Sequence, residues 1–356
     1  LFFTASSSVF QQGLWVTDGT QNGTEQIEFV FTRNQLFGSF IPGEEKIFYG
    51  TSQRQGVFFT WISDGTREGT FIINNLFSFR GANYVGVLND RLFLGLDQRN
   101  SPSGTLIDGN IGLWVSDGTE DGTFFLKDIN PNSNSAVLDN KIYFSASGDN
   151  KGSELWVSDG TETGTFLLKD INIGINGSNP DNFIDVNNQI FFAADNGNLG
   201  RELWVTDGTQ NGTYLVKDIN PGNNSSNPEN FAVFENKLYF TTDNGENGRE
   251  LWVSDGTNSG TKLVKDIQEG SDSSNPTEIT VLDNKLYFAA EDKEFGRELW
   301  VSDGTETGTN LVEDINPGNE SSNPTQISVF DNKLFFSADD GVIGSEVWVS
   351  DGTKHG

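Results

Sequence analysis

The sequence contains no cysteine and no methionine, and its single histidine, His355, lies one residue before the end of the 356-residue chain. Without cysteine, neither a disulfide framework nor a thiolate metal site can form. A lone terminal histidine leaves almost no place for imidazole acid–base chemistry. These absences exclude several common kinds of active site before any motif is considered.

Basic residues are also scarce. Lys and Arg number 22 against 51 Asp and Glu, which gives a formal net charge of −29. Coulomb repulsion then disfavours nucleic acid and anionic membrane surfaces as partners, whereas cations are natural counterions. No stretch approaches the roughly 20 apolar residues of a membrane helix, and no export signal opens the chain, so we expect no membrane insertion. Because methionine is missing even at position 1, we expect a processed or trimmed piece of a longer product.

What the sequence does contain is one stretch repeated eight times, of which residues 201 to 213 (Arg-Glu-Leu-Trp-Val-Thr-Asp-Gly-Thr-Gln-Asn-Gly-Thr) are an example. Every tryptophan belongs to a copy: Trp15, Trp61, Trp114, Trp156, Trp204, Trp252, Trp300 and Trp348. The alternation of the motif predicts a strand with Leu203 and Val205 on one face and Trp204 on the other. The Asp-Gly step then predicts a tight turn, in which Gly208 adopts a positive φ and the Asp carboxylate bonds to local backbone amides.

The spacing of the motif divides the chain into units. Successive tryptophans are 46, 53, 42, 48, 48, 48 and 48 residues apart. Around Trp252 we expect four strands, at 230–234, 237–242, the motif itself and 261–267, because a two-residue hairpin, a short loop and the Asp-Gly turn separate them. Polar connectors such as 220–228, rich in Pro, Gly, Asn and Ser, join one unit to the next.

Four short strands per unit, without helical periodicity, predict an all-β fold, a β-propeller whose blades are the units. We expect one domain over residues 1–356, with irregular blades in 1–138 and near-identical blades in 139–356. The first unit lacks its first strand and the last lacks its fourth, which predicts 30 strands and, most simply, eight blades. Seven blades with surplus repeats, or part of a longer array, are the alternatives. Each motif Trp should be buried between blades.

Acidic residues recur in the later units, where Glu stands two residues before Trp and a second acidic residue occupies the preceding loop. Carboxylate and amide oxygens at short spacing around glycine are ligands that calcium takes. The candidate metal ligands are Asp195, Glu202, Asp243, Glu250, Asp292, Glu298, Asp339 and Glu346. Their spacing matches no established calcium loop, and the alternative is a solvated hairpin loop whose Glu pairs with a neighbouring arginine.

A family resemblance follows from these motifs. Residues 154–165, which read Glu-Leu-Trp-Val-Ser-Asp-Gly-Thr with a following Gly-Thr, resemble the ELWxxDGT repeat of exported and cell-surface proteins of cyanobacteria and other bacteria. Residues 217–228 are similar to the same repeat. The resemblance is close over 139–356 and loose over 1–138. It implies a propeller-like repeat in an extracellular or cell-surface setting, and it implies no catalytic residues.

We therefore expect a non-enzymatic, exported module for adhesion, scaffolding or protein assembly, with a protein or a surface polysaccharide as partner and calcium as its one candidate cofactor. Two alternatives belong to other classes. Exposed Trp or Tyr would favour a carbohydrate-binding propeller. A carboxylate-dependent hydrolase or lyase is disfavoured, because paired catalytic carboxylates need unlike environments and near-identical repeats provide like ones.

Overall fold

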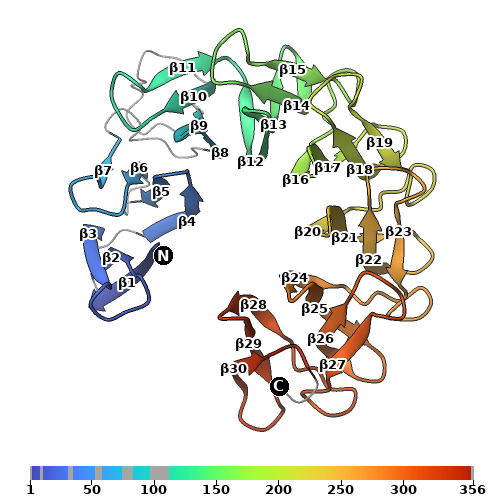
Figure 1. Ribbon diagram of the computed structural model, residues 1–356. Coiled ribbons are helices and arrows are strands. Elements are labelled where there is room, and N and C mark those ends of the chain that lie inside the picture. The colour runs from blue at the N-terminus through green and yellow to red at the C-terminus, as the bar shows by residue number, and fades with distance from the viewer. Residues whose placement is uncertain are drawn as a thin grey trace. The chain divides into compact units, whose positions relative to one another are not determined.

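The computed structural model describes residues 2–8, 11–30, 35–52, 58–73, 83–96 and 112–353 (Figure 1). In these residues 30 strands form eight antiparallel sheets. No helix in this part of the chain is long and apolar enough to cross a membrane. The chain divides into two compact units, Leu1–Asp170 and Ile171–Gly356, and each is described by itself. The expectation of a single domain stays a prediction.

The first unit contains four sheets. The first has three strands, β1 (Phe2–Ser8), β2 (Gln11–Val16) and β3 (Glu25–Val30). The second consists of β4 (Gln35–Pro42), β5 (Ile47–Ser52), β6 (Phe58–Ser63) and β7 (Phe71–Ile72). The third consists of β8 (Asn83–Leu88), β9 (Arg91–Leu96), β10 (Gly112–Ser116) and β11 (Phe124–Lys127). The fourth consists of β12 (Asn130–Leu138), β13 (Lys141–Gly148), β14 (Lys151–Ser158) and β15 (Phe166–Lys169).

The second unit contains the other four sheets. Its first consists of β16 (Asp181–Val186), β17 (Gln189–Asp195), β18 (Arg201–Thr206) and β19 (Tyr214–Lys217). Next come β20 (Glu229–Phe234), β21 (Lys237–Asp243), β22 (Arg249–Ser254) and β23 (Lys262–Lys265). The following sheet holds β24 (Thr277–Leu282), β25 (Lys285–Asp292), β26 (Gly296–Ser302) and β27 (Asn310–Glu313). The last has three strands, β28 (Thr325–Phe330), β29 (Lys333–Asp339) and β30 (Ser345–Ser350).

Within every sheet, strands adjacent in sequence are also neighbours in space, so each sheet is an up-and-down meander. Consecutive meanders of this kind are the blades of a β-propeller, and the predicted fold class is confirmed. The predicted strand count is confirmed as well, because the sheets that contain β1 and β30 have three strands each. The hairpin between β20 and β21 shows the local cause: Glu235 and Asn236 have φ of 49° and 57°, as a type I′ turn requires.

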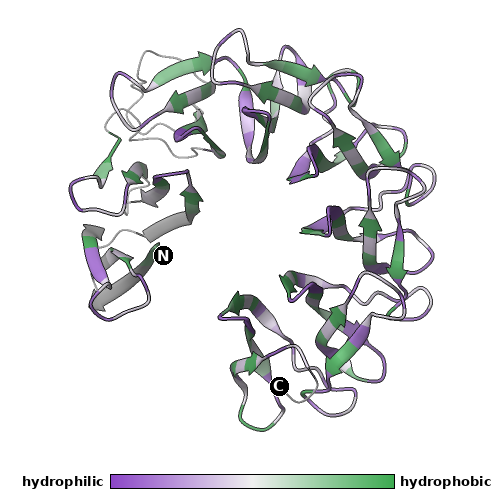
Figure 2. Cartoon of the chain, viewed as in Figure 1, coloured by the Kyte–Doolittle hydropathy of each residue, from purple (hydrophilic) through white to green (hydrophobic). Residues whose placement is uncertain are grey.

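The apolar core lies between neighbouring sheets. In the second unit, Leu203 and Val205 of β18 project toward the next sheet and pack with Phe240 and Trp252. Six motif tryptophans are buried as predicted, with exposures of 1 to 6%: Trp61, Trp114, Trp156, Trp204, Trp252 and Trp300. The two in the terminal sheets, Trp15 and Trp348, are partly exposed. Figure 2 shows hydrophobic residues on strands such as β18 and β22 and hydrophilic residues in most connections, while β12, β16 and β20 also carry hydrophilic residues.

The Asp-Gly-Thr turn has one hydrogen-bond pattern in the seven copies that the structure describes in full. Asp255 Oδ1 accepts bonds from Thr257 N at 2.9 Å and Thr257 Oγ1 at 2.6 Å, and Thr257 Oγ1 accepts a bond from Gly260 N at 2.9 Å. The two Thr bonds hold the pKa of the Asp255 carboxyl below its usual range. Each Asp of the motif is thus occupied in stabilising its own turn, as the turn chemistry predicts.

This turn explains the second glycine of the motif. A Cβ at Gly260 would lie 1.9 Å from Asp255 Oδ1, so Gly260→Ala should cost about 1 to 3 kcal/mol by overpacking. The cost should fall in an Asp255→Ala background, because the clashing carboxylate is gone. A double-mutant cycle in urea measures this coupling. Additive costs of the two substitutions would show that the carboxylate does not dictate the glycine.

Candidate functional site at the blade connectors

The candidate site begins with the Arg-Glu pair at the start of the Trp strand. Three sheets of the second unit carry it: Arg201 and Glu202 in β18, Arg249 and Glu250 in β22, and Arg297 and Glu298 in β26. Adjacent residues of a strand project to opposite faces, so the two side chains of a pair diverge. All three glutamates have an exposure of 0%. Buried carboxylates need partners, and the connectors supply them.

Glu250 binds the connector that follows its own sheet. Its carboxylate accepts bonds from Ile267 N at 3.2 Å, Gln268 N at 3.4 Å, Ser274 N at 2.9 Å and Ser274 Oγ at 2.5 Å. The same bonds recur at Glu202, from Ile219 N, Ser226 N and Ser226 Oγ, and at Glu298, from Ile315 N, Ser322 N and Ser322 Oγ. One carboxylate therefore ties both ends of a connector loop to the Trp strand.

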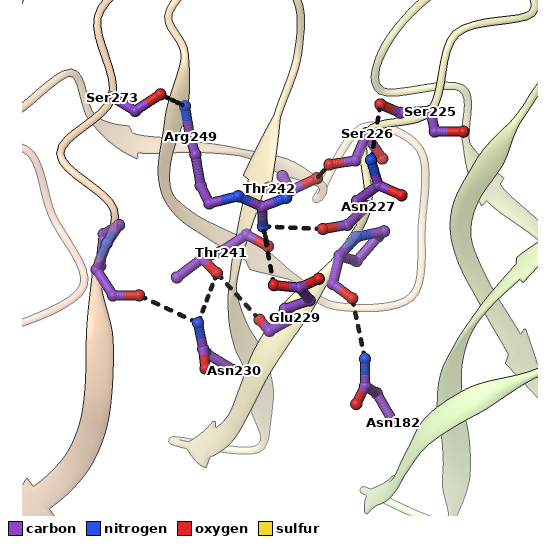
Figure 3. A network of polar contacts seen from close by, with 12 residues as sticks. Asn182, Ser225, Ser226, Asn227, Glu229, Asn230, Thr241, Thr242, Arg249 and Ser273 are labelled. Carbon is purple, nitrogen blue, oxygen red and sulfur yellow. Dashed lines mark hydrogen bonds and ion pairs between the residues drawn. The ribbon is translucent and has the colours of Figure 1, made fainter.

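Arg249 binds the connector that precedes its sheet. Its Nη1 donates to Asn227 O at 2.9 Å and lies 3.7 Å from Glu229 Oε2, as Figure 3 shows. The backbone of the same residue reaches the following connector, because Arg249 N donates to Ser273 Oγ at 2.9 Å. The side-chain bond recurs from Arg201 to Asn179 O and from Arg297 to Asn275 O. Each Arg-Glu pair thus fastens the connectors on both sides of its blade.

Asparagine side chains add bonds from one blade to the next. Asn182 Nδ2 donates to Pro228 O and Asn230 Nδ2 donates to Pro276 O, each at 3.2 Å (Figure 3). Asn182 and Asn230 have φ of 57° and 55°, a left-handed conformation that asparagine tolerates better than most residues. The prolines accept these bonds at the end of Ser-Asn-Pro, which gives that segment of the connector a structural role.

The structure places the predicted metal ligands in two separate environments. The loop aspartates Asp195, Asp243 and Asp339 accept a bond from the glycine amide two residues later, and Asp292 accepts one from Glu294 N. Asp195 lies opposite Arg201 and Ala194 lies opposite Glu202, so strand alternation puts the Asp195 and Glu202 carboxylates on opposite faces of the sheet. In the described residues no three His, Cys, Asp or Glu side chains gather as a metal site would require. Calcium binding by these residues stays a prediction.

The alternative interpretation of a solvated loop whose Glu pairs with arginine is wrong for the three glutamates. Glu202 is fully buried and bonds to Ser226, 24 residues away, whereas Arg201 bonds to Asn179 and Asp181. Glu346 differs, because it is partly exposed and makes no hydrogen bond to any residue that the structure describes. His355 lies outside the described residues.

The serines and asparagines of the connector were not among the predicted site residues. Ser226, Ser274 and Ser322 complete the site, and the aspartate that opens each connector caps a turn within it, as Asp266 Oδ2 does by accepting a bond from Gly270 N at 3.2 Å. The sequence signal that could have identified these residues is that Ser-Asn-Pro and the motif's glutamate occur in the same units. Ser-Asn-Pro follows the four units that carry Glu154, Glu202, Glu250 and Glu298 two residues before Trp, and the first three units lack both.

Comparison with known proteins shows the fold and goes no further. No family model matches the chain, and no curated protein matches its sequence. A solved structure from a study of two prolyl endopeptidases has a TM-score of 0.52 at 9% identity over 87% of this chain and 47% of that chain. This chain thus spans about half the length of that protein. At such a low identity the likeness shows a shared fold alone.

Two further solved structures are similar over most of their own length. The β-propeller domain of the Trilobed protease from Pyrococcus furiosus matches at 14% identity with a TM-score of 0.45, over 87% of this chain and 92% of that chain. BamB from Moraxella catarrhalis matches at 12% identity with a TM-score of 0.47, over 98% of this chain and 95% of that chain. Neither likeness bears on the chemistry of the connectors.

The buried glutamates titrate under two opposing influences. Burial raises the pKa of Glu202 and of Glu250 to about 7, and raises that of Glu298, because the charged form loses its hydration. The bonds from serine and from backbone amides favour the ionised form and oppose this shift. For Glu202 the neighbouring Asp218 adds a further upward contribution. Burial dominates, so Glu202 and Glu250 change charge near neutral pH.

This shift predicts that stability falls as pH rises. A carboxyl whose pKa is about 7 in the folded protein and 4.5 in the unfolded chain contributes stability that is complete below pH 4.5 and lost by about pH 7. Between pH 5 and 8 the wild type should therefore lose about 2 to 3 kcal/mol more than Glu250→Gln, whose amide does not titrate. Urea unfolding of both proteins at each pH measures the difference. A difference of the opposite sign would mean that the hydrogen bonds keep Glu250 ionised throughout.

Proposed function

We propose that this chain is a non-enzymatic module for protein assembly and adhesion in an exported or cell-surface protein of the ELWxxDGT-repeat type. The observation that carries the proposal is the use of the motif's charged groups. The carboxylate of Glu250 accepts bonds from the connector, and the carboxylate of Asp255 accepts bonds from its own turn. The motif therefore builds a rigid frame, and recognition falls to the exposed parts of the connectors.

The connectors vary in chemistry while their anchors stay constant. Ile173 and Ile175 have exposures of 86% and 85%, and the equivalent residues of the next connector are Pro221 and Asn223. Ile173 and Ile175 lie two residues apart on one connector, and a protein partner that covered them would bury apolar surface that the folded chain leaves in water. A varied surface on a constant frame fits a binding module better than an enzyme.

The test is binding of the fluorescently labelled full chain to intact bacterial cells. We expect saturable binding that disappears when proteinase removes surface proteins and persists after periodate oxidation of surface polysaccharide. Ile173→Asn with Ile175→Asn should weaken the binding, whereas Pro221→Asn should not. Loss of binding after periodate alone would replace the proposal with a carbohydrate-binding propeller.

The same protein tests the enzymatic alternative. A panel of chromogenic peptide, ester and glycoside substrates should show no turnover above that of the buffer. Turnover that Glu250→Gln abolishes while the melting temperature is retained would contradict the proposal, because the buried glutamate would then be a catalytic residue. We expect instead that Glu250→Gln changes stability alone.

Calcium is the one cofactor that the proposal includes. With 29 net negative charges, the folded chain repels itself, and a cation bound only to the folded state would stabilise it. We expect low millimolar calcium to raise the melting temperature beyond the effect of sodium chloride at equal ionic strength. Equal melting temperatures with chelator, with calcium and with matched salt would remove calcium and leave Asp195 and Asp243 as turn residues.

A further inference from the structure

The fourth sheet of the first unit differs from the later sheets at the start of its Trp strand, β14. Ser153 stands where they carry Arg201, Arg249 and Arg297, although Glu154 keeps the place of the buried glutamate, with an exposure of 0%. A different cation lies nearby. Lys151 Nζ forms an ion pair with Oδ2 of Asp170, the residue that follows β15. The equivalent residues of the next three sheets are Leu199, Asn247 and Phe295, so the repeated frame does not require an amine at this position.

The two carboxylate oxygens of Asp170 lie in unlike surroundings. Oδ2 contacts Lys151, whereas Oδ1 is buried and accepts no hydrogen bond from the residues that the structure describes. A buried carboxylate oxygen without a donor is costly, and a neutral amide oxygen in its place costs less. The side chains of Lys151 and Asp170 have exposures of 33% and 20%, so their contact is largely shielded while a path to solvent stays open for a small product.

A second carboxyl group lies beside this contact. Leu155 pairs with Lys169, so the antiparallel register places Glu154 opposite Asp170 on the same face of the sheet. The same arrangement recurs at Glu202, where burial and then the charge of Asp218 raise the pKa of the glutamate. An amine, a carboxyl group that it contacts and a second carboxyl group that can carry a proton are the groups that amide formation needs.

We propose that Lys151 and Asp170 form an isopeptide bond, an amide between the two side chains, in the folded protein. Nζ of Lys151 bonds to Cγ of Asp170, and the bond from Cγ to Oδ2 breaks. Two protons of the ammonium group leave with Oδ2 as water, and Glu154 is placed to carry one of them. The charges of the ion pair cancel, and Oδ1 stays as the buried amide oxygen. The held contact supplies the effective concentration that such a condensation needs, and no further reactant takes part.

The bond closes residues 151–170 into a covalent loop that joins the start of β14 to the end of β15. The chain has no cysteine with which to make a disulfide for this purpose. A cross-link restricts the unfolded chain and so favours the folded one, whichever chemistry supplies it. The bond goes beyond the assembly function proposed above and does not depend on it, so either can fail without the other.

Mass spectrometry of the full chain in denaturant tests the proposal. The wild type should lack the mass of one water relative to its sequence, and trypsin should release residues 142–169 joined to residues 170–201. The matched control is Lys151→Arg, whose guanidinium keeps a cation beside Asp170 but stays protonated and forms no amide. This variant should show the full sequence mass. Cyclisation of an Asp-Gly step also removes a water, but that loss would persist in Lys151→Arg and would leave no joined peptides.

The repeat allows the reverse experiment. Asn247 Nδ2 donates to Asp266 Oδ2 at 2.8 Å, in the place of Lys151 and Asp170, and Glu250 takes the place of Glu154. Asn247→Lys should therefore lose a second water and join a second pair of tryptic peptides.

The proton relay has its own test. Glu154→Gln should slow the loss of water during refolding by about 100-fold, because an amide cannot carry the proton. The full sequence mass in wild-type protein kept folded for several days, or tryptic cleavage after Lys151, would overturn the proposal. Lys151 and Asp170 would then be an ion pair and nothing more.

Discussion

Glu250→Ala is expected to destabilise the protein by about 3 to 5 kcal/mol at pH 7.5. The substitution removes an acceptor from Ile267 N, Ser274 N and Ser274 Oγ, all of which lie in buried surroundings. Each buried donor left without a partner costs about 1 to 3 kcal/mol, and water that enters the space recovers part of the sum. Urea unfolding followed by tryptophan fluorescence measures the loss.

The chain supplies the control for this prediction. Glu346 occupies the equivalent position in the last sheet, is partly exposed and makes no hydrogen bond to the described residues, so Glu346→Ala should stay within about 0.5 kcal/mol of the wild type. Similar costs for Glu250→Ala and Glu346→Ala would mean that the connector bonds add little stability. That outcome would remove the physical reason for the motif's glutamate.

Trp252→Ala should cost about 3 to 5 kcal/mol, the usual range for a large aromatic side chain deleted from a core. Trp252 has an exposure of 5% and packs with Leu203, Val205 and Phe240 between two sheets, and Lys217 Nζ lies 5.7 Å from its ring centre. Deleting the Trp252 side chain opens a cavity between two neighbouring sheets, and the sheets could close it only by shifting as rigid units. Thermal and urea unfolding both measure the effect.

The comparison within the chain is Trp348→Ala, which should cost clearly less, because Trp348 is already partly exposed. Trp252→Phe should fall between, since a smaller ring keeps part of the packing. If Trp252→Ala and Trp348→Ala proved equally mild, the tryptophans would not be the main contacts between blades, and the core would have to lie elsewhere.

The features that the sequence predicted correctly depend on local rules. The two-residue alternation around Trp204, the left-handed hairpin at Glu235 and Asn236 and the Asp-Gly turn are each decided by residues within a few positions of one another. Because the unit repeats, a correct prediction for one unit gave correct predictions for the others, and hence for the 30 strands. A fixed period is strong information because an error in one copy is corrected by the others.

The connector site could not be predicted in the same way, because its contacts are not local. Glu202 and Ser226 are 24 residues apart, and no propensity or spacing rule joins a strand residue to a connector at that distance. Strand alternation places Leu203 and Trp204 on opposite faces, and the same rule places Arg201 and Glu202 on opposite faces. Applied to these two residues, it would have argued against an ion pair between Glu202 and Arg201. The groups that Arg201 and Glu202 bind could be identified only from the folded structure.

Hydrogen exchange at the connector of residues 267–275 tests most directly whether the Arg-Glu pairs fasten the connectors. In the wild type the amides of Ile267 and Ser274, which donate to Glu250, should exchange about as slowly as those of the neighbouring strand β22. In Glu250→Ala the two connector amides should exchange roughly 100-fold faster while the amides of β22 stay protected. Unchanged exchange at Ile267 and Ser274 in the variant would contradict the account, because the connector would then hold its place without the carboxylate.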